Sequence, residues 1–165
     1  MSDVTGTYYE GDAIHGYGAE WLIGNGAVPE VFNAVADVES ITFGDMTTAI
    51  IEKTHLRSPN AHREKLAGLR DSGPFVMRCN YRPTHESQNL AGGGAGVFSA
   101  GGLAYFWKNR TEKNHIIRLN DGSPATEFPF SGVITRYQPG EVGRDGKIDL
   151  TVEVTPITDF SADLP

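Results

Sequence analysis

The sequence has one cysteine, Cys79, among its 165 residues, and no apolar run of more than a few residues. A single cysteine excludes an intrachain disulfide and a multi-cysteine zinc site, and it gives no sign of an oxidising compartment. The short apolar runs exclude a membrane-spanning helix. Residues 1–6 have neither the basic nor the apolar segment of a secretion signal, so we expect a soluble protein made in a cytoplasm.

Basic residues are also scarce, and residues 1–52 contain none. That segment has nine acidic residues, whereas residues 53–118 carry eleven basic and four acidic ones, and the whole chain has a net charge of −7. A net negative charge argues against a free-standing nucleic-acid-binding protein. Either the fold mixes these charge blocks on one surface, or an acidic pole and a basic pole favour head-to-tail contacts between subunits.

Glycine and proline are abundant, with 20 and 9 residues, and this content is typical of a turn-rich β protein. Short helices are expected at 61–66 and 84–90, and a glycine-rich loop at 91–102. A first apolar stretch lies at 21–23, and the expected strands after it follow residues 31–41, 47–54, 75–82, 115–119, 128–137 and 148–154, with bulges near 36–37 and 131–132. The sum is roughly seven strands with one or two short helices, which predicts an all-β antiparallel sandwich or barrel.

Two of these strands alternate regularly between apolar and polar residues. In the strand at 75–82, one face carries the residues that we predict to be core: Phe75, Met77, Cys79 and Tyr81. In the strand at 148–154, the face opposite the apolar one carries Asp149, Thr151 and Glu153. This second strand therefore predicts one buried face and one acidic face.

Motifs for catalysis, phosphate binding or metal binding do not emerge from the sequence. Ser99 lacks the preceding glycine of a nucleophile elbow, and the glycine run at 92–102 has no phosphate-loop lysine. The five histidines form no metal-binding spacing. The aromatic and basic residues at 105–110 could stack a base, although a loop anchor or a subunit contact fits the net charge better. We therefore expect no enzyme activity, cofactor or metal.

Three blocks of the sequence, in this order, resemble the tail tube proteins of long-tailed, non-contractile bacteriophages and related gene transfer agents. The middle block matches the pattern R-E-x-x-x-G-L-x-D-x-G followed by N-Y-x-P. The blocks are residues 21–27 with 31–38, residues 62–73 with 75–83, and residues 118–122 with 130–135. The resemblance covers residues 20–157.

The resemblance implies a structural virion protein. Its subunits would be β-sandwiches at 19–158, flanked by an arm at 1–18 and a tail at 159–165. They would form hexameric rings whose inner sheets join between neighbours, and the rings would stack into a tube. The implied partners are other copies of the chain, a tape measure protein, a tail terminator and distal tail proteins. DNA would pass through without specific binding, and no membrane would be involved.

Specific residues follow from this implied role. In the resembling family an N-terminal arm and a long loop join adjacent rings, and here the arm is acidic, the loop is basic, and neither has the apolar periodicity of a core. The candidates for contacts between rings are therefore Tyr8, Asp12, Lys53, Arg57 and Arg63. The alternation of the last strand makes Asp149, Thr151 and Glu153 candidates for an acidic lumen wall that repels DNA. The alternatives are a tube or ring protein of a contractile injection or type VI secretion system and, from a different class, a small β-sandwich enzyme or glycan-binding domain.

Overall fold

The structure is a computed structural model that describes residues 16–57 and 62–158. Nine strands, one α-helix and one 3-10 helix make up this described part. In chain order they are β1 (Glu20–Gly24), β2 (Phe32–Ala34), β3 (Val38–Thr42), β4 (Met46–Glu52), β5 (Lys65–Ser72), β6 (Phe75–Asn80), η2 (Gly96–Phe98), α1 (Leu103–Asn109), β7 (Glu112–Arg118), β8 (Glu127–Pro139) and β9 (Asp149–Pro156). The all-β antiparallel fold expected from the sequence is confirmed.

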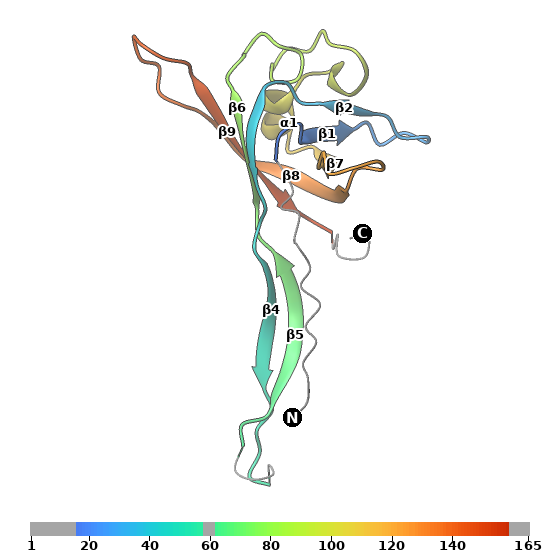
Figure 1. Ribbon diagram of the computed structural model, residues 1–165, viewed down its shortest axis with the longest axis vertical. Helices are drawn as coiled ribbons and strands as arrows, with labels where there is room; N and C mark the ends of the chain where they lie inside the picture. Colours follow the sequence, from blue (N-terminus) through green and yellow to red (C-terminus); the bar gives the residue numbers. More distant parts are fainter. Residues whose placement is uncertain (1–15, 58–61, 159–165) are drawn as a thin grey trace, which may run out of the picture.

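Seven of the strands form one antiparallel sheet in the order β2-β1-β7-β8-β9-β6-β3. Strands β2 and β3 lie at opposite ends of this order but follow each other in the chain, so the sheet must curl back on itself. The short connection between them bonds to both sides: the Val35 amide donates to the Trp21 carbonyl, and the Asp37 carbonyl accepts from the Asn80 amide. The result is a barrel-like body, seen in the upper part of Figure 1.

The segment expected as one strand at 31–41 is therefore two strands with a corner between them. Asp37 occupies the left-handed region at this corner, with φ of 57°. The irregularity expected near residues 36–37 is present, but it is a complete break in the strand. The second expected bulge is displaced, because β8 pairs regularly at Ser131 and Gly132 and shifts register between Ile134 and Arg136.

The core lies inside the curled sheet, where the inward faces of its strands meet. Strand β9 contributes its buried alternate residues Leu150, Val152 and Val154. From the neighbouring strands, Phe75 of β6 stacks on Phe130 of β8 with ring centroids 4.4 Å apart. Burial of such side chains is the main stabilising contribution to the body.

Both helices expected from the sequence are wrong within the described residues. The segment 84–90 forms turns because the side chains of Ser87 and Gln88 bond to the backbone of other segments, which competes with a helix. Residues 65 and 66 belong to strand β5, where pairing with β4 determines the conformation. The helix that does form, α1, places Leu103 and Phe106 in the core.

Strands β4 and β5 form a separate two-stranded hairpin that extends away from the body (Figure 1). It continues the β3–β6 pair, and the two backbones come very close where the body ends and the hairpin begins. A side chain at Gly44 would place its Cβ 2.0 Å from the Gly73 carbonyl oxygen, so this crossing requires glycine. The Gly73 amide also donates to the Asp45 carbonyl at 2.7 Å.

Candidate functional site

The hairpin surface, which we define as the side chains of β4 and β5, exposes an unusual amount of apolar area. Five of its apolar side chains are more than half exposed: Met46, Ile50, Ile51, Leu66 and Leu69. Alternation puts Met46 and Ile50 on one face of the hairpin, and the pairing of Ile51 with Leu66 puts both on the other face. An isolated two-stranded hairpin is at best marginally stable in water. Both faces therefore have the composition of surfaces that another element covers.

The end of the hairpin that lies farthest from the body is basic. Residues 53–65 contain four basic residues and one acidic residue. Three of our candidate contact residues, Lys53, Arg57 and Arg63, are exposed here. The Lys53 ammonium lies 3.9 Å from a carboxylate oxygen of Glu64, which leaves the region with excess positive charge. The other two candidates, Tyr8 and Asp12, lie outside the described residues.

A second surface, the ion-pair face, lies on the outside of the curled sheet over β3, β6, β9 and the second half of β8. It carries the three residues that we predicted to face a lumen, Asp149, Thr151 and Glu153, which are all partly exposed on β9. Arg78 of β6 bonds Asp149 at 2.9 Å, and Arg136 of β8 bonds Glu153 at 2.9 Å.

The acidic face expected for this strand is present on β9, but basic side chains around it offset its charge. Lys147, just before β9, pairs with Glu39 of β3 and lies 3.4 Å from Asp149. Three basic and three acidic side chains thus alternate across the strands. The outer face of β9 alone is acidic, but each of its two carboxylates pairs with an arginine side chain of a neighbouring strand.

The residues that we predicted to be core lie on and just beyond β6. Phe75, Met77 and Cys79 are fully buried, whereas Tyr81 follows the end of the strand and packs partly buried against the core. Burial raises the pKa of the Cys79 thiol to about 12, with a smaller contribution from the charge of Asp37. The thiol therefore stays protonated and behaves as a small apolar side chain.

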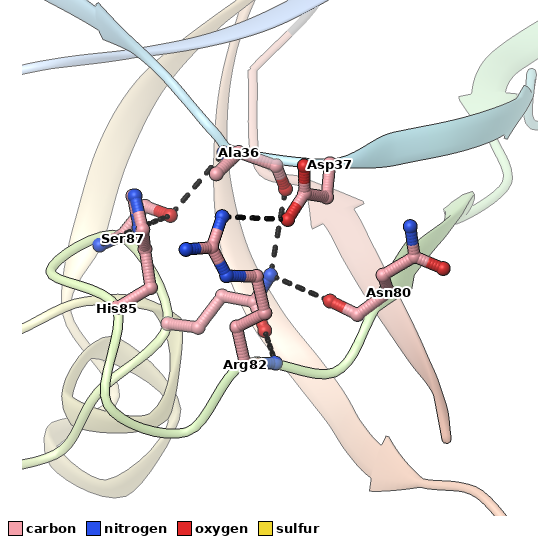
Figure 2. Close-up of polar contacts among 7 residues, drawn as sticks. Ala36, Asp37, Asn80, Arg82, His85 and Ser87 are labelled. Carbon is pink, nitrogen blue, oxygen red and sulfur yellow. Dashed lines mark hydrogen bonds and ion pairs between the residues drawn. The ribbon is translucent and has the colours of Figure 1, made fainter. Parts of the chain in front are cut away.

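A polar corner joins the β2–β3 connection to the loop after β6 (Figure 2). The Arg82 guanidinium bonds the Asp37 carboxylate at 2.9 Å. The Ser87 hydroxyl lies 2.9 Å from Nδ1 of His85 and also accepts from the Ala36 amide at 3.2 Å. A serine–histidine pair invites comparison with a nucleophile, but Ser87 is fully buried and could not reach a substrate. We interpret the corner as a structural lock that closes the curled sheet.

His115 is the buried histidine of the body. Its Nδ1 accepts a hydrogen bond from the Trp21 indole at 3.1 Å, and its ring stacks on Phe130 with centroids 5.3 Å apart. Burial lowers the pKa of His115 to about 3, a shift opposed by a backbone interaction with Gly132 and reinforced by the charge of Lys113. The imidazole is therefore neutral at neutral pH and serves as a packed hydrogen-bond acceptor.

The aromatic and basic segment 105–110 lies on α1 and its end, where Phe106 is buried and Trp107 is 46% exposed. Phe106 is buried beneath the Lys113 ammonium, which lies 5.1 Å from the ring centroid. Trp107 stacks on Tyr137 with centroids 6.3 Å apart. This arrangement is that of an anchor for the helix.

Within residues 16–57 and 62–158, no group of three or more His, Cys, Asp or Glu side chains is placed to hold a metal ion. No helix in this part of the chain has the length and apolar character needed to cross a membrane.

The sequence alone did not reveal the basic side chains of the ion-pair face or the exposed apolar side chains of the hairpin. Arg78 was visible on the polar side of a predicted strand, but its partner Asp149 is 71 residues away and the strand order was unknown. Strand β5 was not recognised, because its sequence, with Gly68 and Arg70, lacks the alternation of apolar and polar residues that indicates a strand. The five apolar residues of β4 and β5 named above are a signal that could have indicated a covered hairpin.

No protein-family model and no curated protein sequence matches the chain. Solved structures do. A chain from the tail of an empty gene transfer agent particle, refined with C6 symmetry, superposes with a TM-score of 0.55 at 13% identity, over 84% of this chain and 91% of that one. A chain from the virion of a native gene transfer agent gives 0.53 at 13% identity, over 84% and 92%.

A third similar chain comes from the baseplate of an anti-feeding prophage, 6-fold symmetrised. It has a TM-score of 0.51 at 11% identity and covers 85% of this chain and 87% of that one. The chain thus has the fold of tail and baseplate chains, which is the fold that the sequence resemblance predicted.

Proposed function

We propose that this chain is the tube subunit of a virion tail, which forms hexameric rings that stack around a channel for DNA. The observation that carries the proposal is the β4–β5 hairpin, which leaves the body with apolar side chains exposed on both faces. A monomer gains nothing from such an element. In a stacked assembly the hairpin can be covered by neighbouring copies, and its burial would then contribute to every contact between subunits.

The symmetry of the similar particles supports the same assembly. The gene transfer agent tail has C6 symmetry and the anti-feeding prophage baseplate is 6-fold symmetrised. Stacking of identical rings is a heterologous, head-to-tail contact that need not close, and this is how a subunit of fixed shape builds a tube.

Residues and partners are assigned within this proposal. The basic end of the hairpin, with Lys53, Arg57 and Arg63, contacts the next ring together with the arm residues Tyr8 and Asp12. The ion-pair face, with Asp149, Thr151 and Glu153, lines the channel. The chain acts without enzyme activity in the virion tail, is assembled in the host cytoplasm, and meets a tape measure protein, a tail terminator and distal tail proteins.

A second candidate is a tube or ring protein of a contractile injection system, favoured by the likeness to the anti-feeding prophage baseplate chain. A small enzyme or glycan-binding domain has less support, because it gives the hairpin no role.

Light scattering after size-exclusion chromatography, with negative-stain microscopy, tests the proposal. We expect rings or tubes with sixfold symmetry from the purified protein. A stable monomer of about 18 kDa at high concentration, with no rings at any salt concentration tried, would contradict it. A contractile system would be distinguished by co-purification with a sheath protein from the native particle.

A further inference from the structure

The ion-pair face places its positive and negative charges at different depths. The side chains of Arg78, Arg136 and Lys147 are 49–55% exposed, whereas the carboxylates that pair with them are 26–33% exposed. The basic groups therefore stand outermost, and the acidic groups lie beneath and between them. Without its carboxylates, this face would present a row of exposed cations.

Such a row is what a phosphate backbone binds. Arginine and lysine contacts to phosphate provide most of the non-specific affinity for DNA, because each contact releases a condensed counterion. Repetition of two or three free cations in every subunit would give a strongly adhesive surface.

We infer that Asp149 and Glu153 act as tethered competitors that keep Arg78 and Arg136 from binding the phosphate backbone of duplex DNA. The inference rests on the proposed function, in which this face lines the channel. Each arginine already donates to a carboxylate at 2.9 Å, so a phosphate would have to displace a partner that is fixed to the adjacent strand.

Because each cation is paired with a carboxylate of the same subunit, this surface interacts only weakly with DNA. A wholly acidic wall would repel DNA over a Debye length, about 8 Å at physiological salt. A wall of paired charges has little net field and offers few free cations, so it neither holds nor strongly repels the polyanion. Lys147 is compensated twice, by Glu39 and by Asp149, which fits the same role.

The test compares DNA retention by charge variants. Asp149→Asn with Glu153→Gln frees both arginines, and we expect retention of a short fluorescent duplex by the assembled protein to rise at least about tenfold at low salt. The gain should fall steeply with salt, because it comes from counterion release. Removing the cations as well, with Arg78→Gln and Arg136→Gln in the same chain, should return retention to the starting level.

The matched control is Glu141→Gln with Asp145→Asn, which makes the same change in net charge at exposed positions of the β8–β9 connection. The inference is overturned if this control retains as much DNA as the face variant, or if the face variant retains no more than the original protein. Glu153→Gln alone, which leaves the Arg78–Asp149 pair intact, provides a milder variant if the double variant folds poorly.

Microscopy of the same samples distinguishes failure of the proposed tube from failure of the inference about the carboxylates. Loss of rings in every sample, including the original protein, would contradict the proposed tube. Fluorescence anisotropy of the unassembled subunit with the duplex would still measure whether freed arginines bind it, and unchanged anisotropy there would overturn the role of the carboxylates.

Discussion

The body and the hairpin of this subunit are built on opposite principles. In the body, alternate residues of β6, β7, β8 and β9 are buried, and Phe75, Phe130 and Trp21 pack in one continuous core. In the hairpin, every residue of β4 is exposed, and its apolar side chains contact solvent on both faces. The body is stabilised by its own contacts, whereas the hairpin contributes mainly through the contacts between copies that we propose. Stability and assembly are therefore expected to respond to different substitutions.

The largest expected effect lies in the core of the body. Phe75→Ala removes a fully buried ring that stacks on Phe130 and meets the edge of Phe43. We expect the free energy of unfolding to fall by about 3–5 kcal/mol, because the lost apolar contact leaves a cavity. Urea denaturation of the monomer at low concentration measures this. A loss below about 1 kcal/mol would show that the body does not depend on this packing.

Acid should weaken the body through His115. Its folded pKa is about 3, against an ordinary value of 6.5. The unfolded chain therefore binds a proton that the folded chain does not, so stability is complete above about pH 6.5 and is lost as the pH falls towards 3. We expect this group alone to remove about 2–3 kcal/mol of unfolding free energy between pH 6 and pH 4.

The measurement is the pH dependence of urea denaturation for the original protein and for His115→Gln, whose slope should be flatter over this range. His62→Gln, at an exposed position near the end of the hairpin, is the matched histidine substitution with which the slope of His115→Gln is compared. Equal slopes in the original protein and His115→Gln would contradict the prediction.

Substitutions in the hairpin should affect assembly strongly and the stability of the monomer little. Ile51→Thr with Leu66→Thr keeps a strand-forming residue at both positions and removes apolar surface from one hairpin face, where the two residues pair across the strands. Both side chains are exposed in the subunit, so we expect the unfolding free energy of the monomer to change by less than about 0.5 kcal/mol. Assembly, followed by light scattering, should nevertheless be lost or strongly delayed.

Val28→Thr is the control for this prediction, because Val28 is fully exposed on the β1–β2 connection of the body. If it delays assembly as much as the hairpin variant, exposed apolar area in general would be responsible, and the contrast between body and hairpin would fail.

The same contrast explains what the sequence could predict. Alternation identified β6 and β9 because each has one face in the core, and the pattern of Leu150, Val152 and Val154 records that burial directly. The hairpin has no buried face inside the subunit, so Lys65–Ser72 carries no alternation and its block was recognised through family resemblance alone. The ion-pair face was half predicted: Asp149 and Glu153 were found, but Arg136 and Lys147 depend on strand order, which local patterns do not determine.

The smallest expected effect on the subunit belongs to the basic end of the hairpin. Arg57→Glu with Arg63→Glu reverses two exposed charges, and single exposed ion pairs contribute only about 0–1 kcal/mol, so the unfolding free energy should stay within about 0.5 kcal/mol. In the proposed tube the same contact recurs around each ring, so stacking should weaken at low salt.

Sedimentation of assembled protein across a salt series measures this, and the deficit should narrow as salt rises, because screening shortens the reach of the charges to about 3 Å at 1 M. Arg57→Gln with Arg63→Gln should give an intermediate deficit, since it removes attraction without adding repulsion. Identical sedimentation of all three proteins at low salt would mean that the apolar faces of the hairpin hold the rings together without help from its charged end.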